Sequence, residues 1–187
     1  MKTVPTLYTP RLIIRPFTMA DLDDYYRVID EPRAGDPEHT PVDINARRAW
    51  LESMVASMTG ALAGWYQPYG DRAVVLRDNH QLVGAVGYVC ELEPFDSLPY
   101  LGGDAHAFQT PEISLYWEIG KAYRRQGYAS EAAQALVDHA FKVMRVKRLF
   151  ALTDPDNEGS LGVMRRLGMY IERAQGACGI LLNPQQP

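Results

Sequence analysis

Apolar positions in the first third of the chain fall into one strand-like run and two helical patterns. The run Arg11–Arg15 is apolar at its centre and lies between two prolines, which predicts a strand. Apolar residues recur at helical spacing from Leu22 to Ile29 and again from Asn45 to Met58, so two helices are expected there. Thr18, three residues before Asp21, predicts a cap for the first of these helices.

Two apolar runs separated by a polar turn come next. Ala73–Leu76 and Leu82–Cys90 flank an Asp-Asn-His sequence that favours a turn, and together they predict an antiparallel hairpin. Two segments rich in proline, glycine and charge have no periodicity and are expected to be loops, Glu31–Pro41 and Glu93–Thr110. Loops of this length in a compact domain tend to be functional or disordered.

The second half of the chain alternates strand and helix patterns. Ile113–Ile119 and Leu149–Thr153 predict strands, while Ala129–Met144 and Asn157–Leu167 have the apolar spacing of helices. Further short strands are expected at Tyr170–Arg173 and Ile180–Leu182. The order β-α-α-β-β-β-α-β-α-β predicts an α/β domain with a mixed sheet, of the α+β kind.

Composition narrows the class of protein. The chain has 187 residues, 47% of them hydrophobic, and a net charge of −4, which suits a single domain over residues 1–187. It has no basic tail or stripe, so nucleic acid is not an expected partner. The N-terminus lacks an apolar signal segment, and no apolar stretch approaches the ~20 residues that span a bilayer. The cytoplasm is therefore the expected compartment, with no membrane partner.

The two cysteines, Cys90 and Cys178, are too few for a disulfide framework and lack the spacing of a zinc site. Since Cys90 lies in an apolar run, we expect it to be a buried free thiol. The histidines are scattered along the sequence, so no metal is expected.

A strand, a basic loop and a helix start follow one another between Ile113 and Ala132. The loop holds Arg124, Arg125 and Gly127 directly before the helix. The first N–H groups of a helix have no partner within it, and with the helix dipole they attract anions. Gly127 lets the backbone approach a phosphate closely because it has no Cβ. The segment therefore predicts a site for a pyrophosphate-bearing ligand, although it matches neither the P-loop nor the dinucleotide-binding sequence.

Three sequence blocks, in order along the chain, resemble one enzyme family. Arg124-x-x-Gly127-x-Ala129 resembles the acetyl-CoA loop of the GNAT acetyltransferases, [QR]-x-x-G-x-[GA]. Residues 157–169 resemble the second block of that family, and residues 9–16 resemble the start of its RimJ/RimL-like branch, which includes ribosomal-protein alanine N-acetyltransferases. The resemblance implies the GNAT acyl-CoA N-acyltransferase fold, in which the central strands are splayed.

The resemblance also implies how acetyl-CoA would bind. In this family the pantetheine arm lies between the splayed strands, so backbone groups of Trp117 and Ile119 would pair with its amides. The Asn157 side chain would contact the cofactor from the next strand–helix junction, although it could instead only cap the helix. The pyrophosphate would be held by the loop and the helix start, formed by Arg124, Arg125, Gln126, Gly127, Tyr128, Ala129 and Ser130.

Two glutamates are candidates for the base that deprotonates the acceptor. The amine must be neutral, because a protonated amine has no lone pair with which to attack the thioester. Several members of the resembled family carry a glutamate near the start of the central strand, which makes Glu112 the first candidate. Glu118, on the same strand, is the second. Glu112 could instead only pair with a neighbouring strand or loop.

The group that would protonate the departing thiolate is not evident. Many family members have a tyrosine for this purpose in the second block, but the matching position here is Met164, which cannot donate a proton. Tyr116, Tyr128 or Ser160 could serve, or CoA could leave as a thiolate or through water.

The sequence thus predicts an N-acetyltransferase that moves an acetyl group from acetyl-CoA to a primary amine, by direct attack in a ternary complex. The acceptor would be a protein N-terminus or a small molecule, and the loops Glu31–Pro41 and Glu93–Thr110 are expected to shape that choice. The alternative is a non-catalytic acyl-CoA-binding module on the same fold. A homodimer is expected if a final strand is left exposed.

Overall fold

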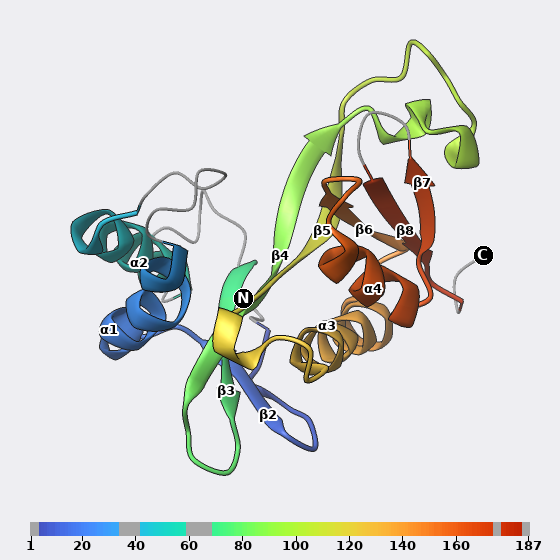
Figure 1. Ribbon diagram of the computed structural model, residues 1–187. Coiled ribbons are helices and arrows are strands. Elements are labelled where there is room, and N and C mark those ends of the chain that lie inside the picture. Colours follow the sequence, from blue (N-terminus) through green and yellow to red (C-terminus); the bar gives the residue numbers. More distant parts are fainter. Residues whose placement is uncertain (1–3, 34–41, 59–68, 174–176, 185–187) are drawn as a thin grey trace. The chain divides into compact units, whose positions relative to one another are not determined.

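The computed structural model describes residues 4–33, 42–58, 69–173 and 177–184 (Figure 1). In these ranges eight strands form a mixed sheet in the order β1-β2-β3-β4-β5-β6-β8-β7, so the expected α/β fold is confirmed. The strands are β1 (Leu7–Tyr8), β2 (Leu12–Pro16), β3 (Gly70–Leu76), β4 (Leu82–Glu93), β5 (Thr110–Ile119), β6 (Arg148–Thr153), β7 (Tyr170–Arg173) and β8 (Ala177–Leu182). The α-helices are α1 (Leu22–Tyr25), α2 (Ile44–Met58), α3 (Tyr128–His139) and α4 (Glu158–Arg166).

Residue contacts divide the chain into two compact units. The first unit comprises residues 1–87 and 117–135, and the second comprises residues 88–116 and 136–187. Strands β4 and β5 and helix α3 contribute residues to both units. That the whole chain is one domain stays a prediction.

The first unit is built on the antiparallel pairing of β2 with β3, from Leu12 opposite Leu76 to Pro16 opposite Arg72. After β2, the predicted cap forms. The Asp21 carboxylate accepts hydrogen bonds from the Thr18 N–H (2.7 Å) and the Thr18 hydroxyl (3.0 Å), at the start of the turn that leads into α1. A π-helical turn, Tyr26–Asp30, extends α1, and α2 packs beside it (Figure 1).

The second unit is built on β6, which pairs antiparallel with β8, which in turn pairs with β7. The parallel pairing of β5 with β6 is registered at a single pair of residues, Ser114 opposite Phe150, as expected for strands that diverge. The Phe95 ring stacks on Phe150 with centroids 4.0 Å apart, and this pair anchors the segment after β4 to the sheet.

Three features differ from the sequence predictions. Cys90 is exposed rather than buried, because the fully buried part of β4 ends at Tyr88 and the strand continues outward to Glu93. The short strand β1 was not predicted. The segment Glu93–Thr110 contains two 3-10 turns, Phe95–Ser97 and Pro99–Leu101. Residues 34–41 of the predicted loop Glu31–Pro41 lie outside the described residues.

Within the first unit, β4 approaches the end of β5 unusually closely at Gly84. The Gly120 N–H donates to the Val83 carbonyl at 2.9 Å. A Cβ at Gly84 would lie 2.1 Å from the Glu118 carbonyl oxygen and 3.0 Å from the Ile119 Cα. Because both obstacles are backbone atoms, the strands could accommodate a side chain there only by moving apart.

We expect Gly84→Ala to lower the free energy of unfolding by about 3 kcal/mol, since overpacking against backbone displaces a paired strand. Gly162→Ala in α4 is the matched control, because its Cβ would meet nothing closer than Arg166 Nη1 at 3.7 Å. That control should raise stability by about 0.5–1 kcal/mol through helix propensity. Urea unfolding of both variants measures the difference, and equal effects would contradict the close approach at Gly84.

Candidate active site

The loop between β5 and α3 has an unusual backbone. Arg125 and Gly127 both adopt left-handed conformations, with φ of 65° and 84°, and α3 begins at the next residue, Tyr128. Backbone of this kind before a helix directs successive N–H groups toward one side and forms an anion-binding concavity. The four residues from Arg124 to Gly127 are exposed. The geometry therefore suits the predicted pyrophosphate ligand.

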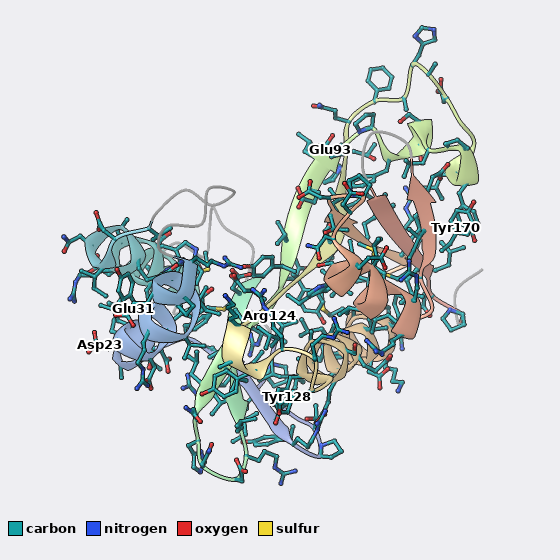
Figure 2. The ribbon with its side chains drawn as sticks, in the orientation of Figure 1. Asp23, Glu31, Glu93, Arg124, Tyr128 and Tyr170 are labelled. Atoms are coloured by element: carbon teal, nitrogen blue, oxygen red, sulfur yellow. The ribbon has the colours of Figure 1, made fainter. Side chains whose placement is uncertain are left out.

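The Arg124 side chain closes this loop onto the preceding strand. Its Nε donates to the Ile119 carbonyl at 3.0 Å, so that carbonyl is already hydrogen-bonded. Figure 2 shows Arg124 and Tyr128 at the two ends of the loop. Ile119 is buried and Trp117 is half-buried at the end of β5. The predicted pairing of both residues with pantetheine stays a prediction.

Glu118 lies in a polar cluster of the first unit. Its carboxylate forms an ion pair with Arg33 and lies 3.5 Å from the Tyr25 hydroxyl. Burial and the Glu118 charge raise the pKa of Tyr25, so its hydroxyl stays protonated and can donate to the carboxylate. The Tyr25 ring stacks on Trp50 with centroids 5.4 Å apart. The Arg47 guanidinium lies over both rings, at 4.7 Å from each centroid.

Asp71, at the start of β3, is a second carboxylate of this cluster. Burial and the Glu118 charge raise its pKa, the Arg47 charge lowers it, and the net result is a pKa of about 6. No residue of the described ranges donates a hydrogen bond to its side chain. Gly87 on β4 makes room for it, since a Cβ there would lie 2.6 Å from Asp71 Oδ1. A carboxylate whose pKa is raised by burial and by a neighbouring carboxylate is a recognised mark of functional sites.

Sequence reasoning missed most of this cluster. Asp71 lies in none of the sequence motifs, and Tyr25 is one position in the helical pattern from Leu22 to Ile29. Arg47 pairs with Asp30 through two hydrogen bonds of 2.7 Å, a contact between separate helical segments. The one available signal is an acidic residue two positions before a strongly apolar run, and it is weak.

Glu112 lies in the second unit, where it is paired. Its Oε1 accepts a hydrogen bond of 2.8 Å from Arg148 Nε and a second one from Arg148 Nη2. Arg148 also reaches Asp96 at 3.4 Å. Glu112 therefore does pair with a neighbouring strand, which was the alternative to a catalytic role. Its role as base stays a prediction.

Asn157 and Met164 belong to α4 and its cap. The Asn157 Oδ1 accepts from the Ser160 N–H at 3.0 Å, so the residue caps the helix, and its contact with a cofactor stays a prediction. Met164 is fully buried, and a Cβ on Gly179 would lie 3.1 Å from its sulfur. This position therefore points into the core of the second unit.

A cavity of about 960 Å³ lies in the second unit, between the segment after β4 and strands β6 to β8. Three carboxylates line it, those of Glu93, Asp154 and Glu172, and Leu152 supplies apolar surface. Figure 2 shows Glu93 at the end of β4 and Tyr170 at the start of β7. The segment Glu93–Thr110 thus borders a cavity able to hold a small molecule, and its predicted influence on acceptor choice stays a prediction.

In the described part of the chain, no three side chains of His, Cys, Asp or Glu are grouped as metal ligands. Within the same ranges, each helix is too short or too polar to span a bilayer.

Comparison with known proteins gives one consistent result. The family described as acetyltransferase (GNAT) domain matches residues 11–170. The N-acetyltransferase YnaD of Bacillus subtilis is 30% identical over 168 residues, covering 88% of this chain and 82% of YnaD. The spermidine N(1)-acetyltransferase of Escherichia coli K12 is 32% identical over 67 residues, covering 36% of this chain and 35% of that enzyme.

The fold has similar solved structures. The ribosomal-protein-S5-alanine acetyltransferase of Vibrio fischeri superimposes with a TM-score of 0.69 at 16% identity, covering 97% of this chain and 98% of that protein. This likeness agrees with the predicted RimJ/RimL-type resemblance at the level of the fold.

The raised pKa of the half-buried Asp71 carboxylate predicts a pH-dependent stability. The pKa of Asp71 is about 6 in the folded chain, above the ordinary value of 3.8, so the folded state binds this proton more tightly than the unfolded chain does. The stability that the bound proton contributes is therefore fully present below pH 3.8. The contribution is lost as the pH rises through about 6. Asp71→Asn, which resembles the protonated acid, should therefore be more stable than the parent by about 1–3 kcal/mol above about pH 7.

Urea unfolding between about pH 4 and pH 8 measures this effect. The difference between parent and Asp71→Asn should shrink toward the acid end. Asp78→Asn, in the exposed turn after β3, is the control and should show no such trend. A pH-independent difference for Asp71→Asn would mean that the carboxylate is not desolvated as the structure indicates.

Proposed function

The chain belongs to the GNAT family of N-acetyltransferases, and from this we propose that it transfers an acetyl group from acetyl-CoA to a cationic primary amine. Enzymes of this family use acetyl-CoA as the acetyl donor. The observation that carries the proposal is the left-handed loop at Arg125 and Gly127, which lies in the same compact unit as the carboxylates of Asp71 and Glu118. An anion site and a cation site are what the two substrates require.

The donor would be held through its phosphates. Backbone N–H groups of the loop and of the first turn of α3 would bind the pyrophosphate, and the helix dipole would add to the attraction. Trp117 and Ile119 would pair with pantetheine, and Asn157 would contact the cofactor. The residues proposed for the pyrophosphate are Arg124, Arg125, Gln126, Gly127, Tyr128, Ala129 and Ser130.

Of the two predicted bases, the geometry favours Glu118. Glu112 already accepts two hydrogen bonds from Arg148 at one oxygen, and the same cation also contacts Asp96. Glu118 is also paired, with Arg33, but it faces in addition a protonated tyrosine, Tyr25, and it acts on Asp71, a second carboxylate. An ammonium group would favour this arrangement, because its positive charge would stabilise two neighbouring carboxylates.

The reaction then needs two proton losses from nitrogen and one displacement. The ammonium loses its first proton to a carboxylate of the cluster, and the neutral nitrogen attacks the thioester carbonyl carbon. The new C–N bond forms as the C–S bond breaks, CoA leaves as a thiolate, and the nitrogen gives its second proton to that thiolate or to water. A direct transfer of this kind needs no acyl-enzyme, so neither cysteine of the chain is required as a nucleophile.

The comparisons suggest two kinds of acceptor. One relative is named for spermidine, a small polyamine, and one structural neighbour is named for the alanine of a ribosomal protein. Both kinds carry a cationic primary amine, which is the feature that the carboxylates would recognise. A panel of acceptors should therefore include polyamines, amino acids and peptides with a free N-terminus.

We expect acetyl-CoA and CoA to raise the thermal midpoint of the protein, while ATP does not. Binding to the folded state stabilises it by about 2.7 kcal/mol at a hundredfold excess over Kd. Thiol release in the presence of one class of amine would then distinguish an enzyme from a module that only binds acyl-CoA. If ATP shifts the midpoint and CoA compounds do not, the proposed function is wrong.

Glu118→Gln and Glu112→Gln distinguish the two bases. We expect Glu118→Gln to lower kcat about a hundredfold, because it removes the proton acceptor, with little change in the KM for acetyl-CoA. Glu112→Gln should chiefly lower stability, since it removes the partner of a half-buried arginine. The opposite pattern in steady-state kinetics and urea unfolding would assign the base to Glu112.

A further inference from the structure

The N-terminal corner between β1 and β2 is fixed to the first turn of α3 by one carboxylate. Glu131 Oε1 accepts from the Thr9 hydroxyl at 2.5 Å and from the Arg11 N–H at 3.0 Å. Glu131 Oε2 accepts from Arg11 Nε at 2.6 Å. The corner itself is closed by the Leu12 N–H, which donates to the Thr9 hydroxyl at 2.9 Å. Segments about 120 residues apart in sequence thus share one carboxylate.

Arg11 also contacts the loop directly. Its Nη1 donates to the Gln126 carbonyl at 2.9 Å, and its guanidinium lies over the Tyr128 ring at 4.6 Å from the centroid. Its Nη2 would be 3.4 Å from a Cβ placed on Gly127. One side chain therefore contacts Gln126 and Tyr128, the residues on either side of Gly127, in addition to its ion pair with Glu131.

These contacts act on a segment that needs external support. A non-glycine residue in the left-handed region costs about 1 kcal/mol or more, and fixing each loop residue costs conformational entropy as well. Burial would by itself raise the pKa of Glu131, but the hydrogen bonds from Thr9 and Arg11 outweigh it and lower the pKa. The carboxylate is therefore charged when it holds the corner at neutral pH.

We propose that Thr9, Arg11 and Glu131 form a clamp that holds the pyrophosphate loop in its binding conformation. The inference rests on the proposed function, in that the loop binds the phosphates of CoA. The three side chains are positioning residues, because they act through the backbone of the loop. The clamp preorganises the anion site and so raises affinity for the donor without taking part in acetyl transfer.

Glu131→Gln tests the clamp because two explanations predict opposite changes in CoA affinity. If Glu131 mattered only through its charge, removing a negative charge beside an anion site would tighten CoA binding. If it clamps the loop, losing charge-assisted bonds to Thr9 and Arg11 weakens CoA binding, by about tenfold. Glu52→Gln, at an exposed position of α2, changes the net charge equally and should leave affinity unchanged.

Thr9 offers a matched pair. Thr9→Ser keeps the hydroxyl that donates to Glu131, whereas Thr9→Val removes it and keeps the shape. Calorimetric titration of the full chain with CoA should give near-parent affinity for Thr9→Ser and weaker binding for Thr9→Val. At saturating acetyl-CoA, kcat should stay within about twofold of the parent for both, since chemistry is not touched.

Hydrogen exchange without ligand completes the test. Amides 125–130 should exchange faster in Glu131→Gln and Thr9→Val than in the parent, because the loop opens more often. Equal exchange, or CoA affinity in Glu131→Gln equal to or tighter than that of the parent, would overturn the clamp. If the parent binds no CoA, the proposed function fails, and the exchange rates still decide whether the corner holds the loop.

Discussion

The candidate acceptor site, formed by Glu118 and Asp71, depends on two residues of β4 that have no side chain, Gly84 and Gly87. Gly84 lets the strand lie against the backbone of β5 at Glu118, and Gly87 leaves room for the Asp71 carboxylate. A side chain at either position would collide with backbone or with that carboxylate. Two glycines three residues apart on one strand therefore fix where Glu118 and Asp71 lie.

The candidate site for the acetyl donor depends on how the loop before α3 is supported. A loop with left-handed residues at Arg125 and Gly127 is a costly conformation that other contacts must support. The chain supplies support at both ends, through Arg124 on the Ile119 carbonyl and through Glu131 on the N-terminal corner. Hydrogen bonds from side chains thus support the loop in place of the regular backbone hydrogen bonds of a strand or helix.

Acidic side chains illustrate how neighbours decide what a residue can do. Glu112 and Asp21 each form an ion pair with an arginine; burial alone would raise the pKa of Asp21, but hydrogen bonds from Arg15 and Thr18 lower it. Asp71 is of the same chemical type, but it is half-buried near another carboxylate, and its pKa rises to about 6. A group that titrates near neutral pH can exchange a proton with an amine, whereas a paired carboxylate holds its partner in place.

Local chemistry allowed the sequence by itself to determine much of the fold and the donor loop. Apolar periodicity located the helices and most strands, Thr18 and Asp21 formed the predicted cap, and the block at Arg124 to Ala129 identified the family, because each signal lies within a few residues. The exposure of Cys90, the meeting of Asp71 with Glu118, and the contact of Glu131 with Thr9 were decided only by the tertiary structure. They depend on where strands end and on which distant segments meet, and neither periodicity nor short motifs carry that information.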